Sequence, residues 1–104
     1  MSAFVVAPEA EDDLIRIWRY LLEHAGIAIA DRIEGELLNA FESLAAAPGK
    51  GHRRADLTNQ DVYFYTLYEY MIVYRRAARV EFVAVLHGRR NVERILKRRL
   101  AESR

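Results

Sequence analysis

Cysteine is absent from this chain of 104 residues, which excludes a disulfide framework, a thiolate metal site and a cysteine nucleophile. Histidine is scarce, since only His24, His52 and His87 occur, and we expect no structural zinc. No apolar run approaches the roughly 20 residues of a membrane span. The N-terminus lacks the basic start and long apolar core of a secretory signal. We therefore expect a small cytosolic protein without metal, cofactor or membrane partner.

The charged residues that are present divide unevenly along the chain. Residues 1–48 carry nine acidic and three basic side chains, whereas residues 49–104 carry six acidic and thirteen basic ones. The two halves therefore have net charges of −6 and +7, which sum to +1. This asymmetry indicates a surface for a negatively charged partner. With 52% hydrophobic residues, the chain is predicted to fold as one domain over residues 1–104, with a basic C-terminal segment at 91–104.

Two helices are predicted in the first half. Pro8 suits the first turn of a helix, and Gly26 stands where that helix should end. A second helix is predicted from about residue 28 to residue 47, where Pro48 stops it. The short link between them favours an antiparallel hairpin, and Gly35 inside the second helix indicates close helix contact. The first helix carries its apolar residues on one face: Ala10, Leu14, Ile17, Trp18 and Leu21.

Strands are predicted at the N-terminus and after residue 60. A short β-prone segment begins at Phe4, and three aromatic and β-branched segments follow later at tight spacing, which favours an antiparallel meander. They cover residues 62–67, 70–75 and 80–87. Asn91 is expected to cap a final basic helix. The order β-α-α-β-β-β-α predicts an α+β fold, with the helix hairpin packed on a small antiparallel sheet. Because the strand at 70–75 is apolar on both faces, both should be covered.

Several segments, taken in order, resemble the RelE/ParE superfamily of bacterial type II toxins. The resemblance extends from about residue 4 to residue 96 and rests on the joint order and spacing of its motifs. The segments are Ala10-Glu-Asp-Asp-Leu-Ile-Arg-Ile-Trp-Arg-Tyr, Leu44-Ala-Ala-Ala-Pro-Gly-Lys-Gly, Arg54-Ala-Asp-Leu, Tyr70-Met-Ile-Val-Tyr-Arg and Val85-Leu-His-Gly-Arg-Arg-Asn.

The resemblance implies a toxin that is made beside a cognate antitoxin. In that family, the antitoxin's C-terminal segment wraps and neutralises the toxin, and its N-terminal part binds operator DNA. We therefore expect this chain to meet operator DNA only through the antitoxin. Two activities occur in the superfamily: RelE-like members cut mRNA in the ribosomal A site, and ParE-like members inhibit DNA gyrase.

The nuclease reading needs a base, an acid and cations around a ribose 2′-OH and its phosphate. Its candidate catalytic residues are Arg54, Arg75, His87 and Arg89. RelE-like members commonly carry a tyrosine or a histidine pair near the last strand and the C-terminus, but no tyrosine follows Tyr74 here. This departure counts against the nuclease reading. His87 is more simply interpreted as a local cap, and Arg75 as an ion-pair partner for the acidic helices.

Two binding surfaces are also predicted. The candidate target-binding residues are Arg89, Arg90, Lys97 and Arg98. Both helices of the hairpin carry apolar residues outside their main apolar stripes, and we expect a partner to bury these residues. The partner could bind by strand addition or by helix docking. The candidate antitoxin-binding residues are Leu14, Trp18, Leu22, Leu38, Tyr65 and Tyr74. From the residues alone, a homodimer through the same helices is an equal alternative, whereas the resemblance favours an antitoxin.

Three functional hypotheses follow. The first is a ParE-like toxin that inhibits DNA gyrase without catalysing a reaction and is neutralised by its antitoxin. Such a toxin would form either a homodimer or a hetero-oligomer with the antitoxin. The alternative is a ribosome-dependent mRNA endoribonuclease. The third is a basic nucleic-acid-binding domain, whose affinity would fall steeply with salt.

Overall fold

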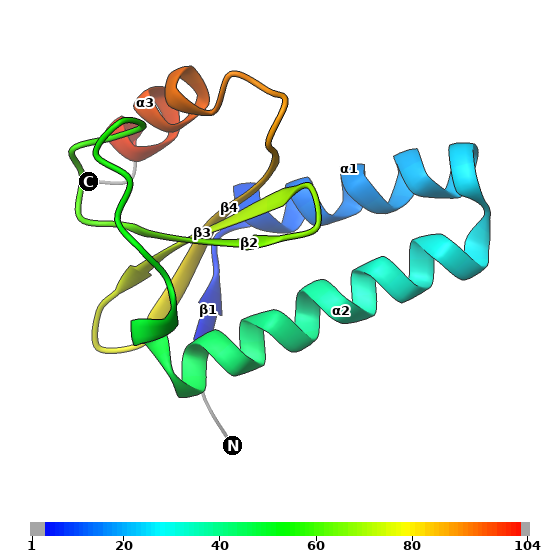
Figure 1. The fold of residues 1–104 in the computed structure, drawn as a ribbon, viewed down its shortest axis with the longest axis horizontal. Coiled ribbons are helices and arrows are strands. Elements are labelled where there is room, and N and C mark those ends of the chain that lie inside the picture. The colour runs from blue at the N-terminus through cyan, green and yellow to red at the C-terminus, as the bar shows by residue number, and fades with distance from the viewer. Residues whose placement is uncertain (1–3, 103–104) are drawn as a thin grey trace.

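A four-stranded sheet in the order β1-β4-β3-β2 lies at the centre of the computed structural model, which describes residues 4–102 (Figure 1). The elements are β1 (Phe4–Val6), α1 (Pro8–Ala25), α2 (Ile27–Ala46), the 3₁₀ turn η1 (Pro48–Lys50), β2 (Tyr63–Leu67), β3 (Tyr70–Arg76), β4 (Val80–His87) and α3 (Val92–Glu102). This order confirms the predicted α+β fold. Ser103 and Arg104, the end of the predicted basic C-terminal segment, lie outside the described residues.

The sheet is mixed rather than wholly antiparallel. Strands β2, β3 and β4 form the predicted antiparallel meander, but β1 joins the outer edge of β4 in the parallel direction, with Phe4 opposite Val80. The register of β3 and β4 shifts once: Tyr74 pairs with Phe82 and Val73 with Ala84. Val83 is therefore an extra residue on β4, a β-bulge that changes which face the following side chains occupy.

Both faces of the sheet are covered, as the apolar pattern of residues 70–75 predicts. One core contains Ile72, Tyr74 and Phe82 of the sheet together with Leu37 and Phe41 of α2. The second core lies on the opposite face and includes Val62 and Phe64, Met71 and Val73, Val83 and Leu86, and Leu96 and Leu100 of α3. The helix hairpin thus packs against one face, whereas α3 and the loop before β2 pack against the other (Figure 1).

The helix hairpin follows the local signals of the sequence. Pro8 stands in the first turn of α1, and Gly26 separates the two helices in a backbone conformation with φ of 91°, which glycine adopts without strain. The prediction for Gly35 was wrong: a Cβ there would meet nothing within 4 Å, so this residue marks no close helix contact. In Figure 1 the Gly26 end of the hairpin projects beyond the sheet.

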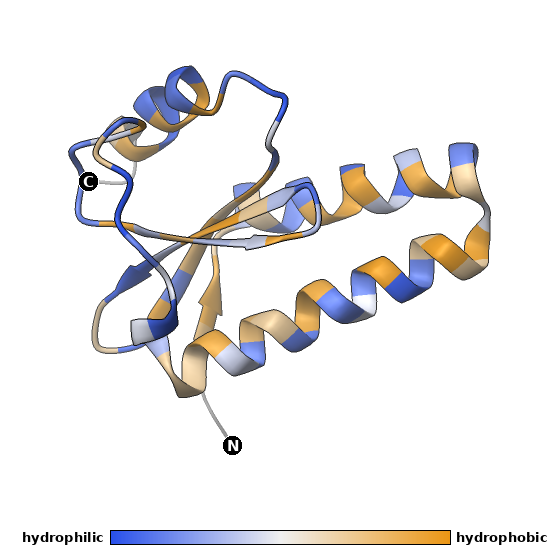
Figure 2. Ribbon diagram, viewed as in Figure 1, coloured by the Kyte–Doolittle hydropathy of each residue, from blue (hydrophilic) through white to orange (hydrophobic). Residues whose placement is uncertain are grey.

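Helix α3 is docked on the sheet. Asn91 caps it as predicted, because its side-chain oxygen accepts a hydrogen bond from the backbone N–H of Arg94 at 3.1 Å. Leu96 and Leu100 are buried, and the hydrophilic side of the helix faces away from the sheet (Figure 2). No helix within residues 4–102 has both the length and the apolar character needed to cross a membrane.

Candidate functional site

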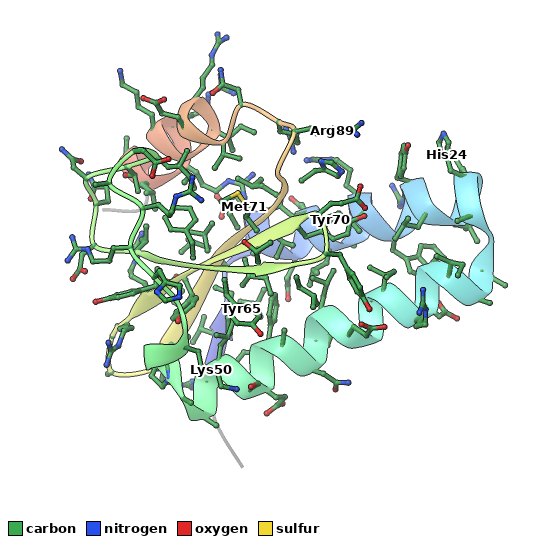
Figure 3. The ribbon with its side chains drawn as sticks, in the orientation of Figure 1. His24, Lys50, Tyr65, Tyr70, Met71 and Arg89 are labelled. Atoms are coloured by element: carbon green, nitrogen blue, oxygen red, sulfur yellow. The ribbon has the colours of Figure 1, made fainter. Side chains whose placement is uncertain are left out.

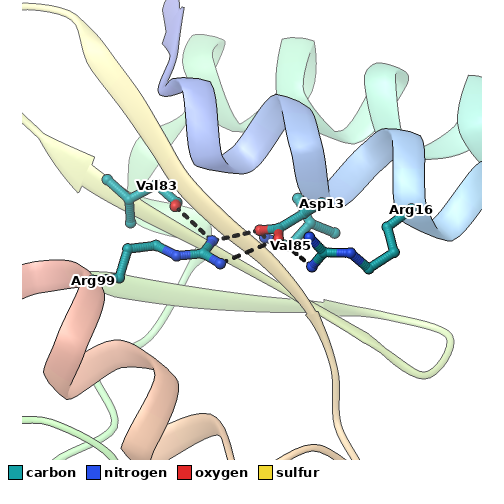
Figure 4. A network of polar contacts seen from close by, with 5 residues as sticks. All are labelled: Asp13, Arg16, Val83, Val85 and Arg99. Carbon is teal, nitrogen blue, oxygen red and sulfur yellow. Dashed lines mark hydrogen bonds and ion pairs between the residues drawn. The ribbon is translucent and has the colours of Figure 1, made fainter.

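A buried ion pair joins the two ends of the chain. Asp13 of α1, 2% exposed, accepts hydrogen bonds from Arg99 of α3 at 2.6 and 3.2 Å and from the backbone N–H of Val85 at 2.9 Å (Figure 4). Arg99 also donates to the carbonyl of Val83 at 3.3 Å, and Arg16 approaches the carboxylate at 3.8 Å. One carboxylate thus fixes α1, β4 and α3 together.

The position of this pair follows from the short N-terminal strand. Strand β1 pairs with β4 only over Val80–Phe82, so the polar backbone groups of the next residues on that edge need other partners. Asp13 and Arg99 supply them at Val85 and Val83. Sequence reasoning missed both residues. Each is a charged residue at a position of the apolar stripe of its helix: Asp13 is three residues after Ala10, and Arg99 is seven residues after Val92. A charge at such a position was the signal that could have identified them.

His87 has the local role that the sequence indicates. Its Nδ1 accepts the backbone N–H of Arg89 at 3.0 Å, which places the proton of the neutral ring on Nε2. That nitrogen lies 3.5 Å from a carboxylate oxygen of Glu69. In this arrangement the basic nitrogen of His87 is already occupied, and the ring holds the turn after β4 against the β2–β3 turn.

The structure does not assemble the four catalytic candidates at one place. Arg75 lies opposite Glu81, and its Nε is 3.9 Å from that carboxylate, so one ion-pair partner of Arg75 is a strand residue, where the sequence suggested a residue of the acidic helices. His87 lies opposite Tyr70. Tyr70 and Arg75 are five positions apart on β3, which is about 17 Å at the usual strand rise.

The loop arginine Arg54 is held by its neighbour. It donates to Asp56 at 2.9 and 2.8 Å, and this hydrogen bond raises the pKa of Arg54 and lowers that of Asp56. Arg54 and Arg90 line one open hollow of about 530 Å³. Lys50, by contrast, lies at the other end of the molecule from Arg89 (Figure 3). The predicted cations that lie close to one another are therefore those near the linker between β4 and α3.

Five exposed cations follow β4 and continue along α3: Arg89, Arg90, Arg94, Lys97 and Arg98. We call them the α3 basic strip. Among the described side chains, none of the five lies within 4.0 Å of a carboxylate. Four of them, Arg89, Arg90, Lys97 and Arg98, are the predicted target-binding residues. All remain available for a negatively charged partner.

The helix hairpin carries an exposed apolar surface on the side away from the sheet. Ile15, Trp18 and Leu22 stand at offsets of 0, 3 and 7 on α1, and Ile27 and Leu38 share one face of α2. The two faces adjoin, because Trp18 Nε1 donates to Asp31 of α2 at 2.9 Å, and Asp31 lies between the two α2 residues on their face. Ile15, Leu22, Ile27 and Leu38 are 47%, 37%, 55% and 44% exposed. We call this set, with Trp18, the hairpin apolar surface.

The antitoxin-binding candidates divide between this surface and the core. Trp18, Leu22 and Leu38 belong to the hairpin apolar surface. Leu14 and Tyr65 are half-buried against the core between sheet and hairpin. Tyr74 is fully buried, and its hydroxyl donates to Pro48 at 2.6 Å and accepts from Gly51 at 2.9 Å. It has no side-chain surface for a partner, so its assignment is corrected to the core.

Strand addition has little room on the outer edge of β2. The backbone groups of Phe64 already exchange hydrogen bonds with His52 at 2.9 and 2.7 Å, as an isolated bridge outside the sheet. At the other side of the sheet, β1 and the Asp13–Arg99 pair cover β4. Helix docking on the hairpin apolar surface is therefore the more accessible of the two predicted modes.

Comparisons with known proteins identify relatives of this fold. Residues 4–92 match the family described as "ParE toxin of type II toxin-antitoxin system, parDE". A solved structure described as "Chromosomal ParDE TA system from P. aeruginosa" superposes with a TM-score of 0.71 at 16% sequence identity, over 84% of this chain and 96% of that one. At this sequence identity the superposition shows that the two chains share a fold and shows nothing about function. No curated protein matches the sequence.

Proposed function

Since the chain belongs to the ParE toxin family of type II toxin–antitoxin systems, we propose that it inhibits DNA gyrase and is neutralised by a cognate antitoxin. The observation that carries the proposal is the family match over residues 4–92. The geometry is consistent with a binding toxin rather than a nuclease: His87 uses its basic nitrogen within its own turn, and Arg75 lies at the opposite end of the sheet.

The test is supercoiling of relaxed plasmid by gyrase in the presence of purified, antitoxin-free protein. We expect a dose-dependent block that the antitoxin relieves. Replacing Arg89 and Arg90 with Glu should weaken inhibition, because both are exposed and unpaired among the described side chains. The matched control replaces Arg19 and Arg32, exposed cations of the hairpin. Unimpaired supercoiling at saturating concentrations of folded protein would refute the proposal.

Ribosome-dependent mRNA cleavage is the alternative. It predicts cleavage of mRNA on translating ribosomes and loss of that activity in His87→Ala. On the present geometry we expect no cleavage, and His87→Ala should reduce only stability, because the variant loses the bond to Arg89. Cleavage by the wild-type protein that disappears in a folded His87→Ala variant would establish the alternative instead.

We assign the antitoxin to the hairpin apolar surface, where a partner helix would cover four side chains that are each more than one-third exposed. Leu38→Glu should weaken antitoxin binding at least tenfold, because a charge would enter an apolar contact. Ile29→Glu is the matched control: this exposed residue of α2 is nine positions away, on the opposite face of the helix. Equal affinities of the two variants, measured by calorimetry, would remove this surface from the interface.

Self-association of the free toxin through the same surface would show as a dimer in light scattering.

A further inference from the structure

Several arginines of the second half of the chain lie beside a carboxylate. Arg53 is paired with Asp61, Arg54 with Asp56, and Arg99 with Asp13. The five residues of the strip have no such partner among the described side chains. The positive charge of the C-terminal half is thus neutralised at several places. Among the described side chains, Lys50, Arg76 and Arg79 also lack a carboxylate within 4.0 Å, but the strip gathers five such cations in one short segment.

The strip is held on a rigid support. Arg94, Lys97 and Arg98 occupy the outward face of α3, while Val92, Leu96 and Leu100 of the same helix are buried. The Arg99–Asp13 pair fixes the helix from one side (Figure 4). Figure 3 shows nitrogen-tipped side chains extending from α3 away from the sheet, and Arg89 at the bend before it. Because the helix is already docked, its backbone loses little further conformational entropy when the strip binds a partner.

Glu93, the acidic residue of α3 whose side chain the structure describes, forms no ion pair with the strip. Glu93 lines the groove between α3 and the loop around Asp56 and Gln60, and it lies four positions before Lys97, on the same side of the helix. Lys97 reaches the same groove without forming an ion pair with Glu93 within 4.0 Å. Among the described side chains, the strip therefore has five cations and one neighbouring carboxylate, Glu93, that pairs with none of them.

The shape and chemistry of the strip fit a phosphate backbone. Arg94 and Arg98 are separated by about 6 Å along the helix axis, and duplex DNA presents one phosphate charge per roughly 1.7 Å of its axis. Several phosphates therefore come within reach of the strip at once. Base-specific reading is not indicated because, among the described residues, no hydrogen bond or ion pair fixes the side chains of the strip in a position to read base edges.

Duplex is favoured over single-stranded nucleic acid. Single strands are bound by aromatic side chains on which bases stack, and residues 88–104 contain no aromatic residue. The exposed aromatic side chains Tyr20 and Tyr68 belong to α1 and to the β2–β3 turn, not to α3. We propose that the α3 basic strip binds the phosphate backbone of duplex DNA without sequence preference. This inference concerns the chain alone and does not depend on gyrase being its target.

The experiment measures binding of the full, antitoxin-free chain to a fluorescent 30-base-pair duplex by anisotropy, in the absence of gyrase, at several salt concentrations. With four or five phosphate contacts, the logarithm of affinity should fall with the logarithm of salt with a slope of about −3.6 to −4.5. Between about 50 and 200 mM salt the affinity should then weaken by roughly 150- to 500-fold.

The strip variant replaces Arg94, Lys97 and Arg98 with Glu, and its slope should shrink to about −1.8 because two cations remain. The matched control replaces Arg19, Arg32 and Arg79 with Glu, which changes the net charge equally at exposed positions elsewhere and should keep the wild-type slope. A Gln version of the strip variant serves if the Glu version does not fold by circular dichroism.

Three results would overturn the proposal. The first is a wild-type slope near zero, and the second is an equal loss of affinity in the strip and control variants. The third is tighter binding of a single-stranded RNA of the same length, which would assign the strip to single strands. Because gyrase is absent from the assay, failure here leaves the supercoiling test untouched, and failure there leaves this one untouched.

Discussion

Replacing Arg99 with Ala should be among the most destabilising single substitutions in the chain, because it removes one partner of a buried ion pair. The Asp13 side chain is 1% exposed and that of Arg99 17%. In Arg99→Ala the Asp13 carboxylate stays buried. It keeps the hydrogen bond from the N–H of Val85 and a weak contact at 3.8 Å with Arg16, whose side chain is largely exposed. Breaking a buried pair by removing one partner costs about 3–5 kcal/mol. For a domain of this size the free energy of unfolding is typically about 5–15 kcal/mol, so the variant loses a large part of it.

The assay is urea unfolding followed by far-UV circular dichroism, with Arg98→Ala as the control. Arg98 is the neighbouring residue and is exposed, and its loss should change the free energy of unfolding by no more than about 0.5 kcal/mol. The difference should persist at high salt, because buried pairs are weakly screened.

A double-mutant cycle isolates the pair itself. Asp13→Ala with Arg99→Ala should cost less than the sum of the single changes, with a coupling energy of up to about 3 kcal/mol. Additive effects, or an Arg99→Ala variant as stable as Arg98→Ala, would refute the reasoning that one carboxylate fixes α1, β4 and α3.

Three further predictions concern stability. Gly35→Ala should raise the free energy of unfolding by about 0.5–1 kcal/mol, since the Cβ meets nothing within 4 Å; a lower melting temperature would contradict this. Gly51→Ala should cost about 1–3 kcal/mol, because its Cβ would lie 2.3 Å from the Tyr74 hydroxyl, and Tyr74→Phe in the same chain should relieve part of that cost. Burial raises the pKa of Tyr74, so the contribution of Tyr74 to stability should be constant below about pH 10, where unfolded tyrosine ionises, and fall above it as the unfolded chain releases its proton first. Tyr74→Phe should make that fall shallower between pH 9 and 11, and an unchanged profile would argue against it.

The charge asymmetry of the sequence is only partly expressed as a surface. Local and cross-strand ion pairs neutralise Arg54 and engage Arg75, and Arg99 is buried against Asp13. Among the described side chains, five of the remaining cations lie on α3 and the linker before it, and others, such as Arg76 and Arg79, lie near the β3–β4 turn. Counting charges along the chain therefore predicted a negatively charged partner, while the pairing of side chains decides which cations are left for one.

The element boundaries were determined by local chemistry and could be predicted from the sequence alone. Pro8, Gly26 and Pro48 start and stop the hairpin helices, and Asn91 caps α3. The role of His87 is also local, since its partner is two residues away. The order of strands and helices follows from residue spacing, and it carried the resemblance to the toxin family.

Tertiary structure alone decided which distant residues meet. Asp13 and Arg99 are 86 positions apart, and they meet because β1 is too short to cover the edge of β4. The bulge at Val83 and the strand register place Arg75 opposite Glu81 and far from His87. Tyr74 is enclosed by two packed layers, and the Gly35 face is left open. Periodicity shows which face of an element is apolar, but strand register and helix docking determine what each face contacts, and these are properties of the whole chain.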